Sequence, residues 1–72
     1  IIMKLYQIGD TTRWTSDTIF RTAKQAKERI KDLVRGDQEW FTDDFIIWEI
    51  DTRLMLRTEY ETIDIEILKK SI

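Results

Sequence analysis

One stretch of the chain, residues 22–36, has the hydrophobic periodicity of a helix, and this limits the folds open to the rest. Thr22 is a favourable N-cap residue, and Gln25 three positions later completes a capping box. Gly36 is placed to adopt the left-handed conformation that commonly ends a helix. The apolar residues between them share one face at helical spacing: Ala23, Ala26, Ile30, Leu33 and Val34. The pattern predicts an amphipathic helix over 23–35.

The segments before this helix have the character of strands. Residues 2–8 are β-prone and mostly apolar, and Gly9-Asp10 follows them as a turn signal. Residues 12–14 and 18–21 indicate a second strand, with a break at residues 15–17.

The segments after the helix also favour strands. Residues 44–51 predict a strand in which Ile46, Trp48 and Ile50 share one face, while Phe45, Ile47, Glu49 and Asp51 share the other. Residues 53–58 indicate either a further strand or a wide turn. Ile63, Ile65 and Ile67 alternate with acidic residues, which predicts a last strand with an acidic outer face.

The order of these elements predicts one α+β domain over residues 1–72. Its architecture is two-layer β-β-α-β-β, an antiparallel sheet with one amphipathic helix packed on one face. A chain of 72 residues without Cys has no disulfide to stabilise a small core, so the core must be dense or be completed by another chain. The longest apolar run, residues 45–48, is far too short for a membrane span, and a cytoplasmic protein is the default expectation.

Most catalytic arrangements lack their parts in this sequence. The chain contains no His and no Cys, which removes the common nucleophile–base pairs and the usual zinc ligands. Two glycines cannot form a phosphate-binding loop. Carboxylate chemistry stays formally open at Asp37, Glu39, Asp43 and Asp44, but a solvated acidic loop is the favoured interpretation. We therefore expect no enzyme activity, no cofactor and no metal.

Charge is distributed unevenly along the chain. Residues 1–36 carry eight basic and four acidic residues, whereas residues 37–66 carry two basic and ten acidic residues. The acidic set that would face outward comprises Glu49, Asp51, Asp64 and Glu66, which could dock on a basic surface. The predicted helix carries a basic stripe of Lys24, Lys27, Lys31 and Arg35, which is either a solvated face or a contact for phosphates.

Large apolar residues suggest where a partner would bind. Trp40-Phe41 lies in an acidic loop and either caps the core or forms an exposed anchor, with capping favoured. Trp48 is expected to pack in the core. If one helix covers one sheet face, Phe45 and Ile47 point to solvent, to a docked partner or to a second copy. The turn at 53–58 could instead fold over them.

Three segments carry a resemblance: residues 4–8, residues 19–26 leading into the helix, and residues 47–51. Together they look like short accessory proteins of bacteriophages and mobile elements. The resemblance implies a class of small non-enzymatic proteins, some of which inhibit host restriction or CRISPR enzymes. It assigns no functional residue.

These observations lead to three functional hypotheses. The first is a non-enzymatic protein-binding accessory domain, such as an inhibitor of a host nucleic-acid-binding protein. Its partner-binding residues would be Trp40, Phe41, Asp43, Asp44, Phe45, Ile47, Glu49, Asp51, Asp64 and Glu66. The second is nucleic-acid binding through Lys24, Lys27, Lys31 and Arg35. The third is a structural homodimer built on the Phe45/Ile47 face.

Overall fold

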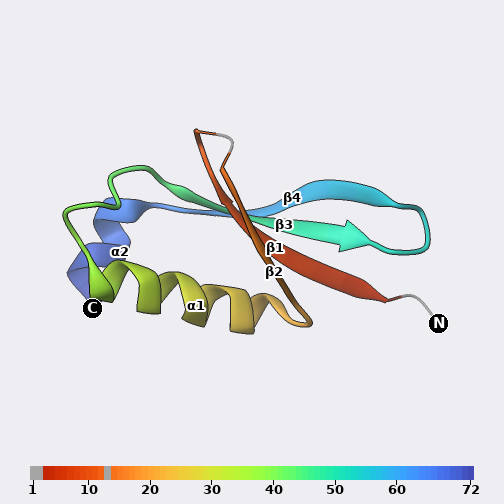
Figure 1. Cartoon of the computed structure of the whole chain (residues 1–72), viewed down its shortest axis with the longest axis horizontal. Coiled ribbons are helices and arrows are strands. Elements are labelled where there is room, and N and C mark those ends of the chain that lie inside the picture. The colour runs from red at the N-terminus through yellow and green to blue at the C-terminus, as the bar shows by residue number, and fades with distance from the viewer. Residues whose placement is uncertain (1–2, 13) are drawn as a thin grey trace.

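The computed structural model describes residues 3–12 and 14–72, and shows a four-stranded antiparallel sheet with two helices (Figure 1). The strands lie in the order β2-β1-β3-β4. The predicted α+β class is confirmed, with one helix more than expected. The elements in chain order are β1 Lys4–Asp10, β2 Thr15–Phe20, α1 Ala23–Gly36, β3 Phe45–Asp51, β4 Leu56–Ile63 and α2 Ile65–Ser71.

Helix α1 begins at the predicted N-cap Thr22, but the capping box is only half formed, because the Gln25 side chain bonds the residue before the cap. The Thr22 hydroxyl accepts a hydrogen bond from the Gln25 backbone N–H at 3.1 Å, and the Gln25 side chain accepts one from the Arg21 N–H at 3.2 Å. The predicted ending is wrong, because Gly36 does not have a positive φ. Instead Asp37 caps the helix, and its N–H donates to the carbonyls of Leu33 and Val34.

The core lies between the two helices and one face of the sheet. Phe45 and Ile47 are 1% and 0% exposed, so the prediction that they point to solvent is wrong. The face left uncovered by the helices carries Ile46, Trp48 and Ile50, and the expected core position of Trp48 is therefore also wrong. Strand alternation identified the two sets of residues correctly, but it contains no information on which set the helix covers. The buried residues are Ile8, Ala26, Ile30, Val34, Phe45, Ile47, Ile65 and Leu68.

The C-terminal segment differs from its sequence pattern. The strand predicted from the alternation of Ile63, Ile65 and Ile67 is wrong, because β4 ends at Ile63 and α2 begins at Ile65 with Asp64 as its N-cap. Ile65 and Leu68, three residues apart, are buried, whereas Ile67 is 68% exposed. The i, i+3 spacing of a helix thus decides which side chains reach the core.

Strand β4 begins within the segment that indicated a strand or a wide turn. Residues 52–55 form the turn, in which Met55 has a φ of 54°, and the strand starts at Leu56. The hairpin formed by β3 and β4 extends well beyond the helices, toward the N-terminal end of the molecule (Figure 1). Its tip is therefore exposed.

The connection between β1 and β2 also differs from expectation. Strand β2 runs without a break from Thr15 to Phe20, and the irregularity lies in the register with β1, between Gln7 and Gly9. The predicted strand at 12–14 is a turn at Thr12, and its middle residue, like residue 2 of the first predicted strand, lies outside the described residues. The Asp10 side chain accepts hydrogen bonds from the N–H groups of Thr12 and Trp14, which stabilises this turn.

Candidate functional site: an aromatic groove with two carboxylates

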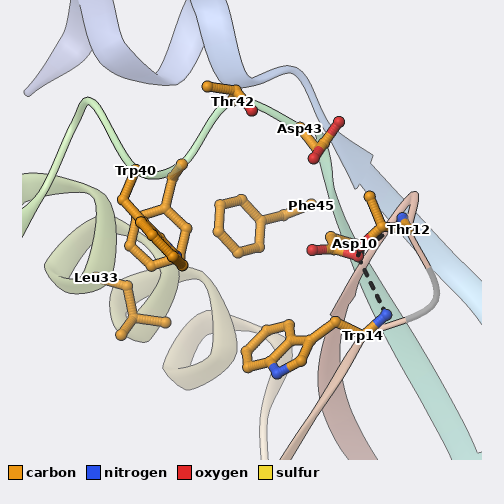
Figure 2. A pocket seen from close by; sticks show the side chains of 9 residues that line it. Asp10, Thr12, Trp14, Leu33, Trp40, Thr42, Asp43 and Phe45 are labelled. Atoms are coloured by element: carbon orange, nitrogen blue, oxygen red, sulfur yellow. Dashed lines mark hydrogen bonds between the residues drawn. The ribbon is translucent and has the colours of Figure 1, made fainter.

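A groove of about 470 Å³ lies between the β1–β2 turn, the second half of α1 and the loop that leads into β3 (Figure 2). Residues far apart in the sequence meet there because the turn and the loop lie at the same end of the sheet. We call it the aromatic groove. It is lined by Asp10, Thr12, Trp14, Leu33, Trp40, Phe41, Thr42, Asp43 and Phe45.

Four of the nine residues that line the groove are aromatic. Phe45 is buried, and its ring lies 5.6 Å from that of Phe41 between centroids. Trp40 is 76% exposed and Trp14 is 45% exposed. Figure 2 shows Phe45, Trp40 and Trp14 around the same groove. The two alternatives for the Trp40-Phe41 pair therefore both occur, since Phe41 packs against the core and Trp40 is exposed.

Each exposed tryptophan belongs to a turn that an aspartate stabilises. The Asp37 carboxylate accepts a hydrogen bond from the Trp40 N–H at 3.1 Å. The Asp10 carboxylate accepts one from the Trp14 N–H at 3.2 Å. These short-range bonds fix the backbone under both indoles, so two large apolar side chains are held toward solvent rather than folded into the core.

Two carboxylates, Asp10 and Asp43, also line the groove (Figure 2). Among the described residues, the Asp10 side chain accepts three hydrogen bonds, all on Oδ1, from the Thr12 N–H, the Thr12 hydroxyl and the Trp14 N–H. An ionised carboxylate has about four acceptor sites on its two oxygens, so these bonds occupy only part of its acceptor capacity. Aromatic faces and carboxylates both attract cations. The groove is therefore suited to a Lys or Arg side chain.

Several of the predicted partner-binding residues have a role in folding, among them Ile47 and Asp44. Ile47 is fully buried. Asp44 accepts a hydrogen bond from the Ile65 N–H at 2.9 Å and so ties the start of β3 to the start of α2. Of the ten predicted residues, four line the aromatic groove: Trp40, Phe41, Asp43 and Phe45.

The predicted acidic sheet face is not assembled. Asp64 and Glu66 belong to the first turn of α2 and its cap, next to the end of β4 that pairs with Phe45. Asp51 lies at the opposite end of β3, roughly 20 Å away by the usual rise of a strand. Its carboxylate accepts from the N–H groups of Arg53 and Leu54 in the hairpin turn.

Glu49 is part of a small polar cluster rather than a free acidic surface. Its carboxylate accepts a hydrogen bond from the Tyr6 hydroxyl at 3.1 Å and pairs with the Lys4 ammonium at 3.2 Å. Burial and the hydrogen bond to Glu49 raise the pKa of Tyr6 above its usual 10.0. The hydrogen bond and the negative charge of Glu49 raise the pKa of Lys4 above 10.5.

The basic stripe of α1 is largely paired with acidic side chains. Lys27 contacts Glu61 of β4 at 2.9 Å, a pairing that only the fold creates. Arg35 contacts Asp32 at 3.0 Å, and Lys31 lies 3.9 Å from Glu28. Lys24 is exposed in the first turn. Three of the four predicted phosphate contacts thus have a competing carboxylate.

The sequence did not predict five of the groove residues, which are Asp10, Thr12, Trp14, Leu33 and Thr42. The turn signal at Gly9-Asp10 was visible, but the position of Trp14 depends on the register between β1 and β2. Across residues 3–12 and 14–72, no cluster of three or more potential metal ligands is found. Over the same residues, no helix has the length and apolar character needed to span a bilayer.

Comparisons with protein-family models, curated proteins and solved structures find no match to this chain. The geometry of the aromatic groove is therefore the basis for a functional assignment.

Proposed function

We propose that the chain is a non-enzymatic protein-binding module whose aromatic groove receives a basic side chain of a partner protein. The observation that supports this is Trp40, which is three-quarters exposed and lines the same groove as the Asp43 carboxylate. A tryptophan held toward solvent by its own turn adds little to a core. It is, however, the residue type that most often anchors a protein interface.

The charge distribution supports a basic partner. The acidic residues concentrated in 37–66 produce a field that attracts positive surfaces and speeds encounter with them. Proteins that bind nucleic acids present such surfaces. A phage-type inhibitor of a host nucleic-acid-binding protein would therefore have a partner of this kind. Nucleic-acid binding through α1 is less favoured because Lys27, Lys31 and Arg35 have carboxylate neighbours.

The proposal is tested by titrating the protein with a lysine- and arginine-rich peptide in a calorimeter at low and moderate salt. Trp40→Ala should weaken binding at least about tenfold, since it removes the anchor. Asp43→Asn should reduce both the affinity and its dependence on salt. Because Trp40 is exposed, its removal should change stability by less than about 0.5 kcal/mol.

Leu54→Ala is the matched control, since Leu54 is 61% exposed in the hairpin turn and lies outside the groove. It should leave binding unchanged. Equal affinity of Trp40→Ala and the unmodified chain for the peptide would overturn the proposal. Tight binding of an oligonucleotide by a chain that ignores the peptide would also overturn it.

A further inference from the structure

Strand β4 is an edge strand with regular geometry over its first half. The strand order β2-β1-β3-β4 leaves one side of β4 without a neighbouring strand among the described residues. The register with β3 is regular from Leu56 to Glu59, and then shifts, so that Tyr60 is an additional residue between Glu59 and Glu61. An unpaired edge can accept another strand. Residues 56–59 are therefore the regular part of this edge, and Tyr60 lies directly after it.

We propose that the segment 56–60 pairs with the same segment of a second copy, antiparallel about a two-fold axis at Thr58. In that arrangement Arg57 of each copy lies opposite Glu59 of the other copy. Leu56 likewise lies opposite Tyr60. The segment Leu56-Arg57-Thr58-Glu59-Tyr60 is thus complementary to itself, and the two sheets join into one.

Charge selects this register over its neighbours. On an edge strand only every second residue directs its N–H and C=O outward, so paired residues must differ by an even number. An axis at Arg57 places two arginines opposite each other, and an axis at Glu59 does the same with two glutamates. Like charges directly opposite are destabilising. Of these three axes, only the one at Thr58 gives two opposite-charge pairs without placing like charges opposite each other.

The side chains of Arg57 and Glu59 lie on the same face of the sheet. Glu59 pairs with Trp48 and Arg57 with Ile50, both on the sheet face opposite the helices. The Arg57 guanidinium lies 4.8 Å from the centre of the Trp48 ring and donates to the Gln7 side chain at 3.3 Å. A guanidinium has five donors, so further donors remain for a carboxylate of the second copy.

Apolar exposure on the other face supports the same pairing. Leu56 is 55% exposed and Tyr60 is 50% exposed, and the ring of Tyr60 packs edge-on against Tyr6. The accessible surface of the chain is 5333 Å², whereas a monomer of 8.8 kDa has about 4,800 Å² by the usual scaling. The single chain thus exposes more surface than is usual for its mass, which a second copy would partly cover. The aromatic groove stays open in this dimer, because Phe45 lies at the other end of β3.

The first test uses a single introduced thiol, because the chain has no Cys. Thr58→Cys should form a disulfide-linked dimer on mild oxidation, since residues directly opposite across a ladder have the Cα separation that a disulfide needs. Thr18→Cys, on the exposed edge strand β2, is the matched control. We expect linkage of the Thr58→Cys chain at least about fivefold faster, because dimer formation raises the effective concentration of the thiol. Equal rates would overturn the proposal.

The second test measures mass against concentration by sedimentation equilibrium. Glu59→Arg should weaken the dimer at least about tenfold, since it places arginines opposite each other and keeps Arg57 over Trp48. The double change Arg57→Glu with Glu59→Arg should restore association, because it re-forms both pairs at unchanged net charge. A monomer at every concentration, or a double variant as weak as Glu59→Arg, would overturn the proposal. Circular dichroism confirms that each variant is folded.

Discussion

Gly9 lies where β1 passes beneath the indole of Trp48. A Cβ at this position would lie 2.7 Å from the Trp48 Nε1 and 2.9 Å from the Trp14 carbonyl oxygen. The carbonyl oxygen belongs to the backbone and cannot turn aside as a flexible side chain can. The absence of a side chain at residue 9 therefore allows both the β1–β2 turn and the position of Trp48.

We expect Gly9→Ala to lower the free energy of unfolding by about 1–3 kcal/mol, as overpacking usually does. Urea unfolding followed by circular dichroism measures this change. Gly36→Ala is the control, since nothing lies within 4 Å of the Cβ position there and φ is not positive. That change should be neutral or should stabilise by up to about 1 kcal/mol. Equal effects of the two substitutions would contradict this account of Gly9.

The Tyr6, Lys4 and Glu49 cluster predicts how stability changes at high pH. The pKa values of Tyr6 and Lys4 are both raised in the folded chain. A raised pKa means that the folded state holds the proton more tightly, so this stability is present below the unfolded pKa near 10 and is lost as pH rises through the folded value.

Unfolding by urea at about pH 8 and about pH 11.5 tests this sign. The unmodified chain should lose stability between the two values. Tyr6→Phe should lose less, because the hydroxyl that titrates is gone while Lys4 still contributes. Equal losses for the two chains would show that Tyr6 carries no pH dependence.

At the scale of elements, α2 depends on its cap. The Asp64 carboxylate accepts hydrogen bonds from the Glu66 N–H at 2.9 Å and the Ile67 N–H at 3.1 Å. A helix of seven residues has little stability of its own. It is held by Ile65 and Leu68 in the core and by these bonds.

Asp64→Ala should therefore destabilise the protein by about 0.5–2 kcal/mol, whereas Asp64→Asn, which can still cap, should have a much smaller effect. Thermal unfolding of the two variants gives the comparison. If alanine and asparagine were equivalent at this position, the cap would not be what holds α2.

The elements show what sequence patterns can and cannot predict. The helix at 23–35 was predictable because its cap, its apolar face and its length all agree. Helix α2 was not predictable, because the spacing of Ile63, Ile65 and Ile67 fits a strand as well as it fits a short helix that starts after Asp64. Periodicity separates these only when the run is long.

The site was harder to predict than the fold. Trp40, Phe41 and Asp43 stood out because they are adjacent in the sequence. Trp14 and Asp10 join them only through the pairing of β1 with β2, which no local pattern encodes. The uncovered apolar face was assigned to Phe45 and Ile47 instead of Ile46 and Trp48, because alternation does not tell which face the helices cover.

At the scale of the whole molecule, the two ends present different surfaces. The groove end gathers two exposed tryptophans and two carboxylates around the C-terminal half of α1. The hairpin end has the free edge of β4. A dimer formed through β4 would carry two grooves, and simultaneous binding at both would strengthen attachment to a partner with repeated basic sites.

The central claim is that the aromatic groove binds basic side chains, and the three indole N–H signals in an NMR spectrum test it most directly. Trp14 and Trp40 line the groove, whereas Trp48 lies beneath Arg57 and lines a second hollow on the other side of Trp14. On titration with a lysine- and arginine-rich peptide, the account predicts that the Trp14 and Trp40 signals shift together and saturate while the Trp48 signal stays in place. A shift of Trp48 alone, or no shift of any indole, would contradict it.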